Sequence, residues 1–234
     1  MNSSYKVKSE FHHPLWREKP LAMVGISLKN DGTSGTKFSA MLEWASRRYE
    51  QVGIILADTL YKHTFMSYGI DEKTAYDKAL NLGDRWLEEH QDILQMYEIP
   101  HNLINRWDDW ICHPEYKEIH ERVLSFYQKN KHFQAAVKRD ASNFLNRSPL
   151  MLDRISDDNL VLENACNFLL EEVSADINFA RHHQAADIYP GKPLETMEFM
   201  RNADIPDALK GLDNFPYVSV RFRRRRDIAV LKSM

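Results

Sequence analysis

The first strong hydrophobic pattern in the chain is the run Leu21–Asn30, which carries no charge before Lys29. An unbroken apolar run of this length fits a strand covered on both faces. A polar loop with two glycines, residues 31–36, follows it. Since open α/β sheets place their ligands at the carboxyl ends of strands, this loop predicts a site with Ser27 at its rim.

Gly25 stands two residues before Ser27 and has no side chain, so another backbone or a substrate can come close there. A serine so placed is a candidate nucleophile. The simpler alternative, which this stretch alone favours, is that Ser27 ends a strand and helps to turn the chain.

A second apolar run, Val52–Ala57, also stops at a polar side chain, Asp58. Between the two runs, Lys37–Glu50 has its apolar residues at helical spacing. Strand, helix and strand form a right-handed parallel unit, so Ser27 and Asp58 are expected at the same edge of the sheet. Asp58 either shapes the site or caps the helix that follows it.

The remaining pattern predicts one α/β domain, with residues 1–18 as a flexible segment before it. Pro100 indicates that the third strand is short or lies at an edge. Helical patterns cover Thr59–Tyr97 with a break at Gly69, His113–Arg147 as two helices, Asp157 to about His182, and Leu194–Asn202; strand-like segments cover Ile99–Trp107, Ala186–Tyr189 and Tyr217–Phe222.

The long helix from Asp157 carries a candidate carboxylate. Phe168 and Glu172 are four residues apart and share a face, and Glu172 lies close to the apolar stripe while Glu171 points elsewhere. A partly buried Glu172 would need a cationic partner. A salt-bridged surface glutamate is the alternative that periodicity alone favours.

Composition and charge narrow the class of protein. The 234 residues are 43% hydrophobic and 28% charged with a net charge of -3, so a polyanion would have to meet a local basic patch. Such a patch follows the last strand, where arginines surround Phe222; it is either a solvated tail or a surface that binds phosphates and stacks on bases or sugars. The arginines are Arg221, Arg223, Arg224, Arg225 and Arg226.

The sequence gives no support to several other classes of protein. Cys112 and Cys166 have no ligand spacing, which predicts a reduced, cytoplasmic protein without structural zinc. No signal-peptide pattern and no apolar run of about 18 residues is present, so we expect neither secretion nor a membrane span. The P-loop, the GxGxxG fingerprint and the GxSxG elbow are all missing, and nucleotide-dependent chemistry therefore gets no support.

Taken in order, the motifs resemble those of the cyclodipeptide synthases. The match runs from about Leu21 to Phe222, and its specificity lies in the ordered set, since each motif alone is weak. The motifs are Gly25-Ile26-Ser27 with Asn30, Ile54–Asp58, Gly69, Gly83–Leu87, Phe168–Glu172 and Tyr189-Pro190.

The resemblance implies a Rossmann-like parallel sheet with helices on both faces, akin to the catalytic domain of tyrosyl- and tryptophanyl-tRNA synthetases. It also implies two aminoacyl-tRNAs as substrates, with no ATP, metal or other cofactor. Enzymes that modify the product downstream fit this scheme, whereas a membrane or DNA partner does not.

By the same resemblance, Ser27 receives the first aminoacyl group as an ester, which makes sense because an aminoacyl-tRNA is already activated. Glu172 would hold the substrate ammonium, and Tyr189 would position the acyl group and relay protons. A second aminoacyl-tRNA then gives a dipeptidyl-enzyme that closes to a diketopiperazine. Gly25, Asn30, Asp58 and Phe168 are the expected substrate-binding residues.

The chain also departs from the family pattern. Phe168 stands where many members have tyrosine, so the ring is kept and one hydrogen bond is lost. Ser174 replaces a proline and Leu21 a histidine. Asn30 is typical of the subfamily with Tyr-His, whereas Tyr189-Pro190 marks the other subfamily.

The helix that is arginine-rich in some members is close to neutral here, at Lys78–His90. We therefore expect the tRNA to contact the arginine cluster at 221–226 together with Arg47 and Arg48. Two other functions stay open: a serine hydrolase or acyltransferase, which would need a histidine base, and a catalytically silent relative that binds aminoacyl-tRNA.

Overall fold

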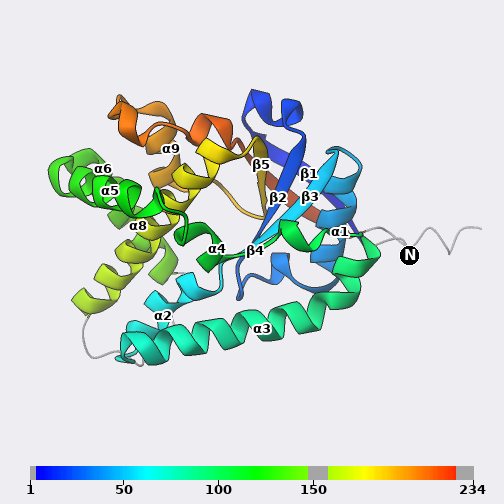
Figure 1. Ribbon diagram of the computed structural model, residues 1–234, viewed down its shortest axis with the longest axis horizontal. Helices are drawn as coiled ribbons and strands as arrows, with labels where there is room; N and C mark the ends of the chain where they lie inside the picture. Colours follow the sequence, from blue (N-terminus) through cyan, green and yellow to red (C-terminus); the bar gives the residue numbers. More distant parts are fainter. Residues whose placement is uncertain (1–3, 147–157, 225–234) are drawn as a thin grey trace, which may run out of the picture.

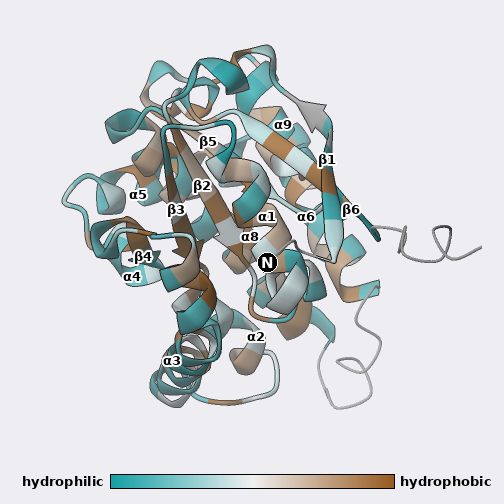
Figure 2. Ribbon diagram, turned by 90° about the vertical axis from the view of Figure 1, so that its right-hand side faces the viewer, coloured by the Kyte–Doolittle hydropathy of each residue, from teal (hydrophilic) through white to brown (hydrophobic). Residues whose placement is uncertain are grey.

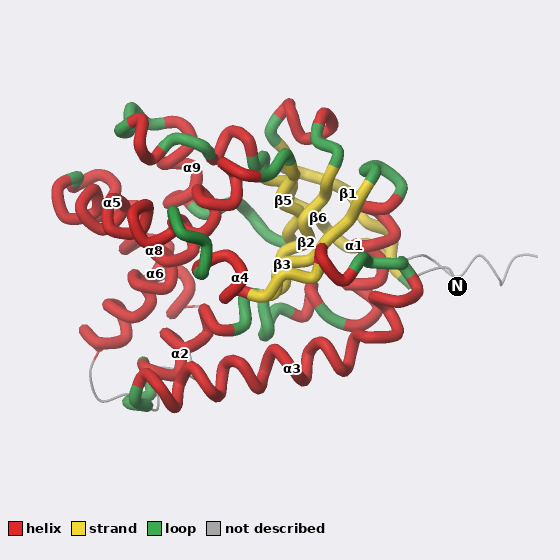
Figure 3. Tube along the Cα trace, viewed as in Figure 1, coloured by secondary structure: helices red, strands yellow, loops and turns green. Residues whose placement is uncertain are grey.

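The computed structural model describes residues 4–146 and 158–224, and these residues build a mixed sheet (Figure 3). The strand order is β1-β6-β5-β2-β3-β4, and every neighbouring pair is parallel except β1 and β6. The strands are β1 (Tyr5–His12), β2 (Leu21–Ile26), β3 (Gln51–Leu56), β4 (Ile104–Arg106), β5 (Ala185–Tyr189) and β6 (Tyr217–Arg224).

Helices cover both faces of the sheet, as expected for an α/β fold of this kind. Figure 1 shows α5, α6, α8 and α9 gathered on one side and α1 on the other, with α3 running along the bottom. The helices are α1 (Gly35–Ser46), α2 (Lys62–Met66), α3 (Glu72–Met96), α4 (Trp107–Ile111), α5 (Tyr116–Lys129), α6 (Lys131–Asn146), α8 (Asp158–His182) and α9 (Glu195–Asn202).

Each face of the sheet has its own core. On one face, Phe38 and Met41 of α1 pack with Val24 of β2. On the other face, Phe179 of α8 packs with Met23 of β2. Because successive residues of β2 point to opposite faces and both faces are covered, the strand is apolar throughout, which Figure 2 shows as brown central strands.

The amino-terminal expectation is wrong. Within residues 1–18, Tyr5–His12 forms β1 instead of a flexible segment, and it pairs antiparallel with β6. Its alternation explains why the pattern looked polar: Val7 is buried, whereas Lys6 and Lys8 are exposed. Successive side chains of a strand point to opposite faces, so a strand with one solvated face buries only every second residue.

The third predicted strand is shorter than the run Ile99–Trp107. Only Ile104–Arg106 pairs with β3, at the edge of the sheet, and Pro100 precedes a 3-10 turn over His101–Leu103. Trp107 already belongs to α4. No helix in the described part of the chain is long and apolar enough to cross a membrane.

Candidate active site

The order of the strands changes side at β2, which is the topological switch point of the sheet. The chain continues from β2 to β3 on one side, and β5 later adds on the other side of β2, parallel to it. Ligands of open α/β sheets bind in the crevice outside the carboxyl ends of two strands that diverge in this way. Ser27 directly follows β2 and Tyr189 ends β5, so both lie at that crevice.

Hydrogen bonds fix the turn that carries Ser27. Its carbonyl oxygen accepts from the Thr33 hydroxyl at 2.7 Å and from the Asn30 amide at 3.0 Å. The Asn30 side chain in turn accepts from the amide of Gly32 at 2.9 Å. The loop after β2 is therefore a closed, self-bonded turn that presents Ser27 at the rim.

The Tyr189 hydroxyl is held beside Ser27. Asn30 Nδ2 donates to it at 2.9 Å, and the Ser27 side chain is also hydrogen-bonded to it. Burial raises the pKa of Tyr189, and these two bonds offset only part of that rise. The phenol is therefore protonated at neutral pH, which lets it donate or relay a proton.

Gly25 has the role that its position suggests. A Cβ placed on it would lie 3.1 Å from Cδ2 of Tyr189 and 3.7 Å from Oδ1 of Asp187. The missing side chain therefore gives room for the Tyr189 ring beside β2, whereas the distance to Asp187 is an ordinary contact.

A cavity of about 290 Å³ opens at this crevice and extends between β2, β5, α6 and α8. Ser27, Asn30, Tyr189, Phe168 and Glu172 all line it. Burial, with the carboxylates of Asp187 and Asp140 nearby, raises the pKa of Glu172 to about 8. Glu172 makes no hydrogen bond or ion pair to another described residue, so its carboxyl group is free to meet a ligand.

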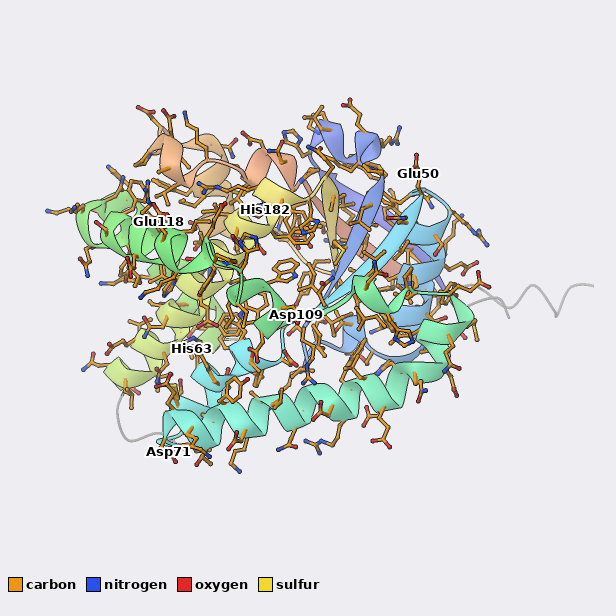
Figure 4. All side chains as sticks on the ribbon, in the orientation of Figure 1. Glu50, His63, Asp71, Asp109, Glu118 and His182 are labelled. Carbon is orange, nitrogen blue, oxygen red and sulfur yellow. The ribbon has the colours of Figure 1, made fainter. Side chains whose placement is uncertain are left out.

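The buried, ion-paired carboxylate of α8 is Glu171, not Glu172. Burial raises its pKa, but a hydrogen bond with His63 and the charge of Lys62 outweigh that effect and hold it at about 2. Glu171 lies 2.8 Å from Lys62 Nζ and 2.9 Å from His63 Nε2, and it accepts a bond from Trp107 Nε1 at 3.0 Å. His63 is buried, and Figure 4 shows it between α2 and α8, whereas Asp71 lies at the lower edge of the molecule.

Asp58 does not line the cavity. It ends β3 at the same sheet edge as Ser27, but its side chain is fully buried and accepts from the Thr59 amide at 2.8 Å and from Arg106 Nε at 2.6 Å. Gly83 of α3 packs directly against it. The expected substrate contact is thus wrong, and Asp58 instead caps the next turn and ties β3 to α3 and β4.

The proposed tRNA-binding arginines fall into two groups. Arg47 and Arg48 end α1 near Pro20, which precedes β2, so they lie at the sheet edge opposite the cavity. Arg221, Arg223 and Arg224 continue β6 beyond Ser219, the residue paired with Tyr189, and therefore lie at the cavity edge. Arg225 and Arg226 lie outside the described residues.

The first strand adds two cations to the second group. Lys8 stands opposite Arg221 and Lys6 opposite Arg223 in the β1–β6 register, and all of these side chains are exposed. Like charges directly opposite each other in a sheet repel, unless an anion neutralises them. Of these residues and Arg224, only Arg221 has an ion pair within the described structure, with Glu10. We call Lys6, Lys8, Arg221, Arg223 and Arg224 the basic ladder.

An open depression connects the basic ladder with the cavity. Asn30, Pro190 and Gly191 line both the cavity and the depression. Arg221 and Phe222 line the depression but not the cavity. The ladder is therefore next to the mouth of the cavity and not on a remote face.

Sequence reasoning missed three further carboxylates of the cavity, Asp140, Asp176 and Asp187. Asp140 accepts hydrogen bonds from Thr196. The sequence pattern offered a way to find the other two. Asp176 follows Glu172 by one helical turn, and Asp187 precedes Tyr189 by the two-residue period of a strand, so each shares a face with a predicted site residue.

A family model described as cyclodipeptide synthase matches residues 10–176. Curated protein sequences gave no match. Among solved structures, a cyclodipeptide synthase from Fluoribacter dumoffii is 24% identical with a TM-score of 0.80, covering 96% of this chain and 100% of the other.

Two more structures share this fold. One is a Mycobacterium tuberculosis protein whose structure relates these synthases to type I tRNA synthetases; it is 13% identical with a TM-score of 0.71, covering 94% of each chain. The other is a synthase from Candidatus Glomeribacter gigasporarum bound to Phe-tRNAPhe. It is 15% identical with a TM-score of 0.68, covering 92% of this chain and 91% of the other.

Proposed function

Because the chain belongs to the cyclodipeptide synthase family, whose members form peptide bonds from aminoacyl-tRNAs, we propose that it joins two aminoacyl groups through an ester on Ser27. The observation that carries this assignment is the hydrogen-bonded pair of Ser27 and Tyr189 hydroxyls beside the free carboxyl group of Glu172. Among the described residues, no histidine contacts the Ser27 hydroxyl, so the pair does not resemble a hydrolase triad.

In the first step, Ser27 Oγ attacks the ester carbonyl carbon of an aminoacyl-tRNA. The ribose oxygen of the tRNA leaves and takes up a proton, and the aminoacyl group stays on Ser27 as a new ester. No external energy source is needed, because one ester replaces another. Tyr189, whose hydroxyl is bonded to the Ser27 side chain, is the proton donor and acceptor that we assign to this exchange.

In the second step, the amine of the bound aminoacyl group attacks the ester carbonyl carbon of a second aminoacyl-tRNA. The first peptide bond forms, and the ribose oxygen of this tRNA leaves and takes up a proton, so that a dipeptidyl group stays on Ser27. The ammonium must first lose a proton. Its usual pKa of about 8 is close to that of Glu172, so transfer to this carboxylate costs little free energy. The new terminal amine then attacks the Ser27 ester, which releases a diketopiperazine and restores the serine hydroxyl.

We assign the tRNA backbone to the basic ladder, with Arg225 and Arg226 as its expected continuation. The ladder borders the mouth of the cavity, where the aminoacyl end of the tRNA must enter, and its exposed cations suit phosphate contacts. Arg47 and Arg48 are left out because they lie at the opposite sheet edge. We place the reaction in the cytoplasm, where charged tRNAs are made, with tailoring enzymes acting on the released product.

Intact-protein mass spectrometry after mixing with a full set of aminoacyl-tRNAs tests the assignment. Wild-type protein should carry one aminoacyl adduct and release diketopiperazines, and Ser27→Ala should do neither. Ser46→Ala, at an exposed serine of α1, is the matched control. An adduct that persists in Ser27→Ala would overturn the role of Ser27, and release of free amino acids alone would indicate a hydrolase.

A further inference from the structure

The cavity holds more carboxylates than the proposed reaction uses. Glu172 accounts for the ammonium of the bound aminoacyl group. Asp176 on α8 and Asp187 on β5 line the same cavity, and the side chain of neither makes a hydrogen bond or an ion pair within the described residues. Groups of this kind are buried at a cost unless a partner meets them.

The protein itself offers these two carboxylates little compensation. Arg201 is the cation that acts on both, but no atom of it comes within salt-bridge distance of either. Two of its nitrogens are engaged elsewhere, Nη1 with Glu198 at 3.1 Å and Nη2 with the carbonyl oxygen of Phe215 at 3.2 Å, and its buried Nε has no hydrogen-bond partner. Lys192 also lines the cavity, but it is exposed at the mouth.

A second observation indicates that a polar ligand completes this cavity. Asn164 of α8 lines it and is only 3% exposed, yet its Nδ2 has no hydrogen-bond partner. His63 lines it as well, and its buried Nδ1 is also unpartnered. Buried polar atoms are rarely left unsatisfied, because each costs about 1–3 kcal/mol.

The position of Asp187 relates it to the acyl group on Ser27. Gly25 precedes Ser27 by two residues, which in a strand is about 6.6 Å, and Asp187 Oδ1 lies beside Gly25. An acyl group on Ser27 whose side chain runs back along β2 therefore points its far end at Asp187. A long side chain spans this interval, and a short one does not.

We propose that Asp176 and Asp187 bind the positively charged side chain of the aminoacyl group on Ser27, so that the enzyme selects tRNA charged with lysine, arginine or histidine. This inference rests on the proposed function. Burial raises the pKa of Asp187 to about 7, and that of Asp176 well above its usual range, so both hold protons easily until a cation arrives. The charge of the ligand compensates for the buried carboxylates and displaces those protons.

The first test identifies the acyl group by mass. Wild-type protein is mixed with total tRNA charged with all the protein amino acids, and the mass of the adduct on Ser27 is measured by intact-protein mass spectrometry. The mass should correspond to lysine, arginine or histidine. An adduct of an apolar or acidic amino acid overturns the inference while leaving the proposed function intact, and the absence of any adduct and any diketopiperazine overturns both.

The second test removes one charge at a time without changing side-chain size. Asp187→Asn and Asp176→Asn should each lower kcat/KM for the basic aminoacyl-tRNA by about ten- to a hundredfold, the size expected for a charge-assisted contact. Both variants should gain relative activity with glutaminyl-tRNA, whose side chain is long and neutral. Asp92→Asn, at an exposed aspartate of α3, is the control and should leave both rates unchanged.

A variant that loses activity equally with basic and neutral aminoacyl-tRNAs would mean that the aspartate is structural, and that result contradicts the inference. Circular dichroism of each variant identifies folding failure. Should one variant not fold, the mass of the wild-type adduct and the other variant still decide the question.

Discussion

Asn30 Nδ2 donates a hydrogen bond of 2.9 Å to the Tyr189 hydroxyl, across 159 positions of the chain. The bond joins the turn after β2 to the end of β5, the two strands that flank the crevice. Since the same hydroxyl is bonded to the Ser27 side chain, Asn30 fixes the distance between the proposed nucleophile and its proton relay.

Replacement of either partner should slow the reaction by different amounts. Tyr189→Phe removes the proton relay of the proposed first step, so both formation of the acyl-enzyme on Ser27 and release of diketopiperazine should slow. Asn30→Ala removes the neutral hydrogen bond to Tyr189, together with the bond accepted from the Gly32 amide and a longer one to the Pro190 carbonyl oxygen at 3.4 Å. The bond to Tyr189 is worth about 1 kcal/mol, so the rate should fall by at least roughly fivefold. Quenched-flow sampling with intact-mass detection separates the two effects. Equal losses in both variants would mean that Tyr189 only supports the turn.

Glu172→Gln keeps the size of the side chain but removes its charge and its basicity. The rate should fall by about ten- to a hundredfold, the value of a charge-assisted contact. In the wild type, kcat/KM should rise with pH toward about 8, because the carboxylate accepts a proton only when ionised. A variant that keeps this pH profile would show that another group is titrating.

The cavity carboxylates should also make stability depend on pH. Burial raises the pKa of Glu172 to about 8, with Asp187 and Asp140 facing it, and that of Asp187 to about 7, with Arg201 opposing the rise. Between about pH 4.5 and pH 8 the native state then binds more protons than the unfolded chain, so stability falls as pH rises. The free energy of unfolding of Asp187→Asn, measured in urea, should approach or exceed that of the wild type at pH 8 and fall behind it at pH 5.

Glu171 should matter for folding more than an exposed acid does. Glu171→Gln leaves the Lys62 ammonium, whose side chain is 15% exposed, without a counter-charge, and breaking a buried pair in this way costs about 3–5 kcal/mol. Asp77→Asn breaks an exposed pair with Lys73 and should cost less than about 1 kcal/mol. Urea unfolding of the two variants measures the difference. Similar midpoints would show that the ion pair of Glu171 with Lys62 does not stabilise the fold.

The basic ladder should control the salt dependence of tRNA binding. Each phosphate contact removed should reduce the slope of log K against log salt by about 0.7–0.9. Lys6→Ala with Arg223→Ala should therefore flatten the slope by about 1.4–1.8 and weaken binding at low salt. Arg47→Ala, at the opposite sheet edge, is the control. If only the control variant showed a flattened slope, the tRNA would bind at the sheet edge that carries Arg47 and not at the basic ladder.

Local pattern was enough for the central elements. The apolar runs that became β2 and β3 are buried on both faces, and the segment broken at Gly69 became α2 and α3, with Gly69 at φ +75° between them. Ser27 could be placed because a strand end followed by a turn is a local feature. The family resemblance then supplied Tyr189 and Glu172, which periodicity alone would not select.

The predictions that were wrong concern residues whose surroundings are set by contacts between segments distant in the sequence. The fate of Asp58 was decided by Arg106 and Gly83, which no local pattern connects with it. Periodicity could not separate Glu171 from Glu172 either, because α8 is covered on nearly all sides and both glutamates face the interior or the cavity. For that reason the cationic partner was expected at Glu172, whereas Lys62 pairs with Glu171.

The placement of β6 between β1 and β5 has a consequence for how the protein is made. Tyr5 pairs with Arg224, so the strand that leaves the ribosome first is completed by the strand that leaves it last among those described. β1 must wait unpaired for almost the whole time of synthesis, and contacts of such long sequence separation close late and slowly. Nascent chains halted before residue 217 should therefore be open to proteases at β1, although β2 and β3 have already paired.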